Sequence, residues 1–480
     1  MRITSTLIYF SLFIFLLSCS KEENYIPIDD VLPVASDDII TSSLLTIVEI
    51  PVLENDSTGD TMLSNSLSIV GGTDSDANGT FDTLVISGEG VWKVSNSGVF
   101  SFLPTNGISG NPTPIKYFGK DKEKNKSNEA NVVINAVAIA NVNLTQVYTK
   151  LSDYKFFVGN MKDQLPSLNV LPYEPASSLF TDYAKKKRFV WMPQGAKATY
   201  NGDSKSLELP IGAALIKTFY YENVQNVTPI GTKRIIETRI MLRTTTGWIF
   251  ADYIWNENQT EATYSLSGSN TDVTWLDGTN TLKSVNYRIP AEVQCLTCHK
   301  VKVNSIEVVT PIGIKPQNLN FNYNYGNETK NQLSKWIEKG YLENNFTFPT
   351  AQNTTVDYKD TSKDLTTRVR SYVDINCAHC HKADSHCNYR DMRFSFNETA
   401  PENALAQTNL GVCLNTADMQ GLPQQYDKIV TPANINASML YFRINTTNET
   451  YRMPLHGRTL IHNEGVALVA EWINSLTPCR

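Results

Sequence analysis

Short runs in which apolar and polar residues alternate dominate the chain up to about Pro290. In the first part of this region the runs are separated by turn residues, as where Asn96–Gly98 separates Val91–Val94 from Val99–Phe102. Alternation with a period of two predicts strands that are buried on one face. A series of such strands joined by short turns is typical of a β-sandwich, which we expect over residues 34–140.

The alternation continues with longer connections over residues 141–290. Arg234–Arg243 and Trp248–Tyr253 are strand-like, and a turn at Thr244–Gly247 joins them. Val285–Ile289 has the same character. We expect a second, β-rich domain in this region.

After Cys295 the apolar spacing changes to three and four residues, which is the period of a helix. Asn331–Gly340 has this spacing and ends at a glycine. Two further helices are predicted by apolar stripes at Leu365, Val369, Tyr372 and Val373 and at Val466, Val469, Ile473 and Leu476.

The N-terminus has the pattern of an export signal. Arg2 precedes the apolar run Leu7–Leu17, which is too short to span a bilayer. The run ends in Leu16-Leu17-Ser18-Cys19, which resembles the bacterial lipobox and implies that Cys19 becomes the lipidated first residue of the mature protein. The alternative is an ordinary signal peptide with an incidental cysteine. We assign residues 1–19 to a lipoprotein signal peptide and 20–33 to a tether.

Ser20–Glu23 resembles the lysine and acidic signal that sends some lipoproteins to the cell surface. We therefore expect a lipid-anchored protein on the periplasmic side of the outer membrane or on the cell surface. The chain has 42 Lys and Arg against 48 Asp and Glu and no basic tract, which argues against a nucleic-acid partner.

Two copies of Cys-x-x-Cys-His carry the most specific chemistry of the chain. They are Cys295–His299 and Cys377–His381, and random placement of 8 Cys and 6 His would give roughly 0.002 copies. In this motif the two thiols are spaced to bond one haem covalently, and the histidine can ligate its iron. Zinc is the alternative, but the halves of a zinc ribbon usually lie only about 15–20 residues apart. We therefore expect two c-type haems, held by Cys295, Cys298, His299, Cys377, Cys380 and His381.

Three cysteines remain outside these motifs and the lipobox: Cys387, Cys413 and Cys479. An oxidising compartment permits a disulfide among them. Cys387–Cys413 is the pair that we expect, because both residues follow the second motif, although the sequence cannot define the connectivity.

The motifs and several short segments together resemble a family of secreted bacterial diheme c-type cytochromes. The resemblance implies electron transfer, a first haem region over 291–360, and a second haem domain over 361–480 like the α-helical class I cytochromes c. The segments are Leu179–Arg188, Pro210–Gly212, Ile236–Arg239, Trp248, Tyr253–Trp255, Pro290, Cys295–His299, Pro311–Gly313, Asn318–Asn320, Asn376–His381 and Arg452–Pro454.

The predicted sandwich resembles the cadherin-like or immunoglobulin-like repeats of secreted bacterial proteins, through Ala35–Asp38, Ile50–Asp56 and Gly98–Pro104. Asp74–Gly79 within it matches the first half of a calcium loop, but the twelfth position is Val85 where the loop needs glutamate. We expect a hairpin turn there rather than a calcium site.

The two predicted haems differ in their candidate sixth ligands. For the second haem we expect Met453, which lies 72 residues after His381 and precedes Pro454. The competing methionines are Met392, Met419 and Met439. For the first haem the candidates stay open: Met192, Met241, His386, His456, His462 or an open position.

Two function classes follow from these expectations, together with a weaker one. The first is a non-enzymatic electron carrier with an unidentified redox partner protein. The second is a peroxidase-type diheme enzyme, in which an open first haem would react with peroxide. A surface adhesin that carries haem is the third. We favour the carrier because the sequence places no acid–base group for peroxide cleavage.

Overall fold

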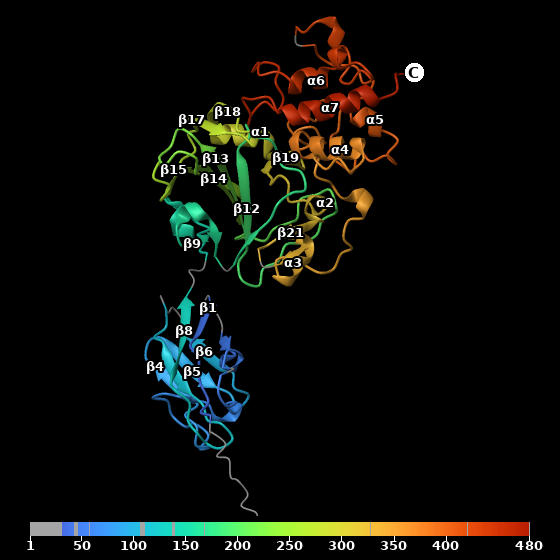
Figure 1. Ribbon diagram of the computed structural model, residues 1–480. Helices are drawn as coiled ribbons and strands as arrows, with labels where there is room; N and C mark the ends of the chain where they lie inside the picture. Colours follow the sequence, from blue (N-terminus) through green and yellow to red (C-terminus); the bar gives the residue numbers. More distant parts are fainter. Residues whose placement is uncertain are drawn as a thin grey trace, which may run out of the picture. The chain divides into compact units, whose positions relative to one another are not determined.

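The computed structural model describes residues 31–42, 47–56, 58–105, 111–136, 140–167, 169–326, 328–419 and 421–479. The chain divides into two compact units, Met1–Ala136 and Val137–Arg480 (Figure 1). The predicted signal peptide, Cys19 and Ser20–Glu23 lie outside the described residues. Within those ranges no helix has the length and apolar character needed to cross a membrane.

The first unit contains two four-stranded sheets that share one core. The strand orders are β1-β8-β7-β3 and β2-β6-β5-β4, and β1 and β8 run parallel. Trp92, Phe102 and Tyr117 are fully buried between the sheets, as the alternating pattern predicts. The strands are β1 Asp38–Ser42, β2 Val48–Ile50, β3 Ser68–Ile69, β4 Thr83–Ile86, β5 Gly90–Val94, β6 Phe100–Pro104, β7 Ile115–Phe118 and β8 Ala130–Ala136.

The segment Asp74–Gly79 forms an exposed turn in this unit. The amides of Asn78 and Gly79 donate to the Asp74 carboxylate over 3.2 and 2.9 Å. Asp74, Asp76 and Asp82 lie close together, but these carboxylates, of which Asp74 and Asp76 are exposed, already serve the turn as hydrogen-bond acceptors. The geometry is that of the predicted hairpin turn.

The second unit is built on an eight-stranded sheet with the path β11-β12-β13-β14-β15-β16, to which β17 and β18 are added through β13. The long strands β13, β14 and β15 lie side by side (Figure 1). Two short strands, β9 Phe157–Val158 and β10 Leu165–Pro166, form a separate pair. The sheet strands are β11 Val170–Pro172, β12 Lys185–Trp191, β13 Ala214–Val224, β14 Thr232–Thr244, β15 Gly247–Trp255, β16 Ala262–Tyr264, β17 Ser269–Leu276 and β18 Leu282–Ile289.

The two faces of this sheet differ in chemistry. One face packs Phe189, Ile216 and Ile240 against the segment that precedes the sheet in sequence. On the other face, paired residues of β12 to β15 form rows across the strands. One row is apolar and consists of Val190, Leu215, Met241 and Phe250. The adjacent row is charged and consists of Arg188, Lys217, Arg239 and Asp252. Strand alternation produces this division, because every second residue of each strand shares a face.

The chain after the sheet carries the two Cys-x-x-Cys-His motifs. The predicted helices are present as α3, which Asn331 caps, as α4, which Asp364 caps, and as α7. Val369 and Val373 of α4 share a core with Val469 of α7, and the two helices lie side by side (Figure 1). The elements are α1 Glu292–Cys298, β19 Lys300–Val303, β20 Ile306–Val309, α2 Pro316–Leu319, β21 Asn322–Asn324, β22 Thr329–Asn331, α3 Gln332–Glu338, α4 Leu365–Asn376, α5 Ala406–Asn409, α6 Met439–Ile444 and α7 Asn463–Ser475.

The predicted fold class is wrong for the C-terminal region. The structure is β-rich and multidomain: strand makes up 30% and helix 17%, in seven helices of the described chain, and no helical cytochrome c-like region closes it. Irregular segments separate α4, α5, α6 and α7. In these segments polar side chains bond to the backbone, as where Asn403 Nδ2 donates to Glu398 O over 2.9 Å. Such bonds compete with the hydrogen bonds of a helix.

The predicted disulfide is also wrong. Cys413 bonds to Cys479 with a Cα–Cα distance of 5.9 Å, and Cys387 is a buried free thiol. Strand-like pairing holds Cys413 to Val430, and the Ala433 amide donates to Ile473 O in α7 over 2.9 Å. The chain end after α7 is thereby brought to Cys413, although 66 residues separate the two cysteines.

Candidate functional site

The second motif lines a cavity together with Met453. The cavity follows the end of α4 and encloses about 1360 Å³, including its open mouth. Cys377, Cys380 and His381 border it with Met453, so the structure brings together the four residues predicted for the second haem. Two other methionines also border the cavity and are alternative candidates for the sixth ligand.

Met392 and Met439 also line this cavity, whereas Met419 does not. Thr416 Oγ1 donates to the Met419 sulfur over 2.9 Å. Met439 is 2% exposed and packs in the core that α4 and α7 share. Met453 therefore remains the predicted ligand, and Met392 and Met439 remain its competitors.

His381 has the environment of a neutral imidazole. Its ring packs edge-on against Phe394 at 5.5 Å, and its Nδ1 is buried with no hydrogen-bond partner among the described residues. Burial, with the charges of neighbouring basic groups, lowers the pKa of His381 to about 4. Neutral imidazole is the form that ligates a metal.

The first motif is oriented by a hydrogen bond of its histidine. His299 Nδ1 lies 3.0 Å from Thr310 O, just after β20. Since a carbonyl only accepts, Nδ1 carries the proton, and the lone pair of Nε2 is left free for a metal. Burial lowers the pKa of His299 to about 4, which keeps this ring neutral as well.

The helix α1, which contains Cys295 and Cys298, lacks a packing surface of its own. It has seven residues, none of them is buried in the described structure, and Val293 is 72% exposed. A helix of this length is marginal in water without tertiary packing. A flat apolar group bonded to both cysteines would supply that packing, so the donor set and its surroundings fit a covalent haem.

The two motifs meet at their second cysteines. Cys298 Sγ and Cys380 Sγ are 3.8 Å apart, and Cys380 Sγ is also 3.8 Å from Thr297 O. The Lys302 amide of β19 donates to Asp384 O over 2.6 Å, which links the segments that follow each motif. This convergence joins residues 82 positions apart in the sequence.

Cys298, His379 and Cys380 offer ligand atoms that all lie within 4.8 Å of one another. Two sulfurs and one imidazole are a donor set that zinc accepts. The same convergence therefore keeps the zinc alternative open for a chain whose cysteines carry no haem.

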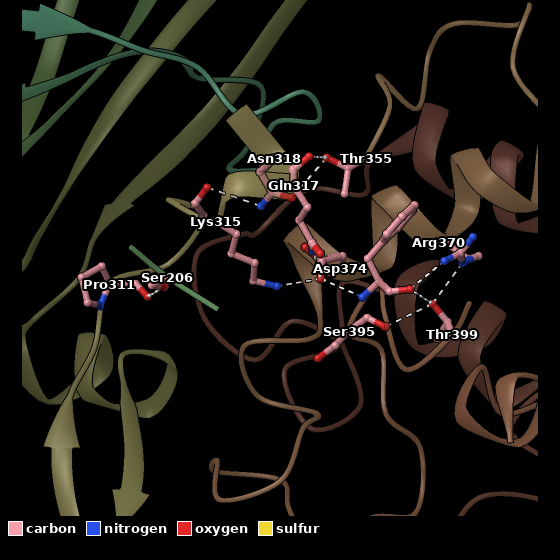
Figure 2. A network of polar contacts seen from close by, with 12 residues as sticks. Ser206, Pro311, Lys315, Gln317, Asn318, Thr355, Arg370, Asp374, Ser395 and Thr399 are labelled. Atoms are coloured by element: carbon pink, nitrogen blue, oxygen red, sulfur yellow. Dashed lines mark hydrogen bonds and ion pairs between the residues drawn. The ribbon is translucent and has the colours of Figure 1, made fainter. Parts of the chain in front are cut away.

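A buried ion pair holds α4 against the chain that follows the first motif (Figure 2). Lys315 Nζ donates to Asp374 Oδ1 over 2.7 Å, and the Phe396 amide donates to the same oxygen over 3.0 Å. Arg370 Nη2 donates to Phe396 O over 2.7 Å. Figure 2 shows Asp374 at the centre of this network. In the sequence it lies three residues before Cys377, where the second motif begins.

His462 is excluded as a haem ligand by its own contacts. Both of its ring nitrogens pair with tyrosine hydroxyls, Nε2 with Tyr358 and Nδ1 with Tyr372, each at 3.0 Å. Phe180 stacks on the ring at 4.1 Å, and the Phe180 amide donates to Asn376 Oδ1 over 2.8 Å. Leu179–Arg188 is thus tied to the helix that leads into the second motif.

The other candidates for the sixth ligand of the first haem lie in different places. Met192 is 1% exposed in an apolar core. Met241 pairs across the sheet with Phe250, whose ring contacts the His299 ring at 5.3 Å. His386 lines the cavity of the second motif, which Thr297 and Cys298 of the first motif also border.

A buried acid–base group lies on the sheet face beside the first motif, and the sequence analysis missed it. Arg239 Nε and Nη2 donate to the Glu237 carboxylate over 2.9 and 2.5 Å, and Tyr287 Oη donates to it over 2.7 Å. Asp252 of β15, which is 4% exposed, lies directly opposite Arg239 of β14 in the sheet. Burial and the charge of Glu237 raise the pKa of Asp252 well above its usual range. The available signal was the pair of opposite charges Glu237 and Arg239, two residues apart between the apolar pairs Ile235-Ile236 and Ile240-Met241.

No protein-family model matches this sequence, and a search of curated proteins finds no match either.

Proposed function

We propose that this chain is a diheme c-type electron carrier that acts outside the cytoplasm. Cys295 and Cys298 hold one haem in this proposal, and Cys377 and Cys380 hold the other. Iron in such a group supplies reversible one-electron chemistry. The contact between Cys298 and Cys380 at 3.8 Å is the observation that carries the proposal, because it joins the attachment points of the two sites.

The residues around each motif have distinct tasks in this proposal. Thr310 orients His299 so that Nε2 is the free nitrogen, and burial keeps His299 and His381 neutral. Met453 borders the second cavity and would give the iron of that haem a thioether ligand, which suits electron transfer without substrate binding.

A haem count tests the proposal. The purified chain should keep two haems through acid–acetone extraction and show a c-type pyridine haemochrome. Cys295→Ala with Cys298→Ala should leave one haem, because only one attachment site is removed. Cys387→Ala is the matched control and should leave two, since Cys387 is a free thiol outside both motifs. Recovery of a zinc-containing chain without haem would contradict the proposal.

A lipid anchor at Cys19 completes the proposal. The protein would face its unidentified redox partner from the periplasmic side of the outer membrane or from the cell surface.

A peroxidase-type enzyme is the second candidate. The buried group of Glu237, Arg239 and Asp252 favours it, because these residues supply acid–base chemistry on the sheet face that meets His299. Electron paramagnetic resonance separates the two candidates. A low-spin first haem supports the carrier, whereas a high-spin first haem that is oxidised by peroxide supports the enzyme.

A further inference from the structure

Three basic residues stand side by side on the sheet face beside the first motif. Arg188 of β12 pairs with Lys217 of β13, and Lys217 pairs with Arg239 of β14. Residues paired in this way point to the same face and lie within about 5.5 Å of each other at Cβ. Lys186 belongs to the next row and adds a fourth basic group to this face.

The carboxylates of this face neutralise only part of the positive charge. Glu174 pairs with Arg188, and Glu237 pairs with Arg239. Asp252 lies opposite Arg239 in the same row, but burial and the charge of Glu237 raise its pKa well above the usual range, which disfavours its charged form. Lys186 and Lys217 form no ion pair with a carboxylate of the described chain. Their ammonium groups face the Phe219 ring instead, at 5.9 and 4.9 Å from its centre.

Like charges on directly opposed strand positions destabilise a sheet. Burial, together with the neighbouring cations, lowers the pKa of Lys186 to about 7 and lowers that of Lys217 well below its usual range. Two lysines without a carboxylate partner beside two arginines leave a positive charge that a bound anion would balance. A carboxylate matches ammonium and guanidinium groups in charge and in hydrogen bonding.

The location of these lysines links them to the first motif. The row of Lys217 adjoins the row of Phe250, and the Phe250 ring contacts His299. Lys186 also lines a large cleft that is open to solvent, together with Tyr220 and Tyr221 of β13. An anion can therefore reach the lysines either as part of a group bound at the first motif or from solution.

We propose that Lys217 and Lys186 form a carboxylate-binding site beside the first motif. The carboxylate comes from the propionates of the haem that the proposed function places there, or from a small soluble carboxylate that enters by the cleft. The first source rests on the proposed function, and the second does not.

Potentiometric titration of the full chain, with a count of haems, tests the haem source. Lys217→Gln should keep two haems and lower the midpoint potential of one, because a cation stabilises the more negative ferrous state. We expect at least a tenfold change in the ratio of oxidised to reduced haem at a given potential, which is about 59 mV for one electron. Lys217→Arg keeps the charge and should resemble the wild type.

Lys185→Gln is the matched control, because Lys185 adjoins Lys186 in β12 but is exposed and paired with Glu222. It should leave both potentials unchanged. Where Lys217→Gln does not fold, Lys186→Gln in the same titration takes its place.

Calorimetry with succinate tests the soluble source. Succinate should bind the wild type and bind Lys217→Gln at least tenfold more weakly. If the haem midpoint potentials of the two proteins are equal, this result assigns the site to a soluble carboxylate. The inference is overturned when the Lys217→Gln chain has wild-type potentials and succinate binding is absent or unaffected. A wild type with fewer than two haems contradicts the proposed function, and the succinate measurement still decides on the site.

Discussion

At the residue scale, hydrogen bonds decide which histidines are free to bind a metal. His462 is buried and His299 is partly buried, and loss of solvent lowers the pKa of each to about 4, which keeps both rings neutral at pH 7. His299 uses one ring nitrogen for Thr310 O, whereas His462 uses both for tyrosine hydroxyls. The same residue type therefore serves as a candidate ligand in one place and as a structural group in the other.

Met453 provides the sharpest test of the second site. The oxidised protein should show a weak band near the red end of the visible spectrum, from charge transfer between ferric iron and a thioether. Met453→Ala should abolish it and yield a high-spin haem, while Met453→His should abolish it, stay low-spin and lower the potential. Met419→Ala is the control, because Met419 does not line the cavity. Loss of the band in Met392→Ala or Met439→Ala instead would assign the ligand to that residue.

His462 should make the protein acid-sensitive. Burial depresses the pKa of folded His462 to about 4, against the usual 6.5. Between these two values the unfolded chain binds the proton more readily, so stability is complete above pH 6.5 and falls as the pH drops toward 4. A shift of this size corresponds to about 3 kcal/mol. Urea denaturation between pH 4 and 6.5 should show that the unfolding free energy of His462→Gln depends less on pH than that of the wild type. Identical pH profiles of the two proteins would contradict this role of His462.

At the element scale, short helices depend on contacts from distant segments. The helix α4 has twelve residues and shares a core with α7, and the Lys315–Asp374 pair also fastens it to the chain before α2. The helix α1 has no buried residue in the described structure. We therefore expect α4 to be ordered by the protein itself and α1 to gain order from the group bonded to its cysteines.

Asp374→Asn should weaken the fold at the second motif. The Asp374 side chain is 1% exposed, and its loss of charge leaves Lys315 without its buried partner. Breaking a buried pair costs about 3 kcal/mol, which denaturation followed by haem absorbance would measure. Glu222→Gln is the control, because it breaks the exposed pair with Lys185 and should cost less than about 1 kcal/mol. Equal stabilities of the two variants would show that the buried pair contributes little.

At the scale of the whole molecule, the chemistry lies in one of the two units. Both motifs, Met453 and the basic face belong to Val137–Arg480, whereas Met1–Ala136 contains the sandwich and the predicted anchor. Anchoring and haem binding should therefore be separable.

Cys19→Ser tests this separation. The variant should be released as a soluble protein, because acyl chains are the only anchor that we expect, and its haem content should equal that of the wild type. Detergent partition and haem absorbance measure the two properties. A variant that still enters the detergent phase would show that another part of the chain holds it to the membrane.

The sequence by itself determined the features that depend on neighbouring residues. These are the two Cys-x-x-Cys-His motifs, the helices α3, α4 and α7, and the strands β14 and β15. Residue spacing and helix capping depend on residues a few positions apart, so the sequence shows them directly.

Only the tertiary structure decided which distant segments meet. Cys298 contacts Cys380, and Cys413 forms a disulfide with Cys479. His462 pairs with the hydroxyls of Tyr358 and Tyr372. Lys217 lies between Arg188 and Arg239 in the sheet. The α-helical cytochrome c-like fold that the resemblance implied for residues 361–480 was wrong, although the helices that local periodicity predicts there are present as α4 and α7. The contacts between distant segments join residues tens to hundreds of positions apart, so local periodicity carries no information about them.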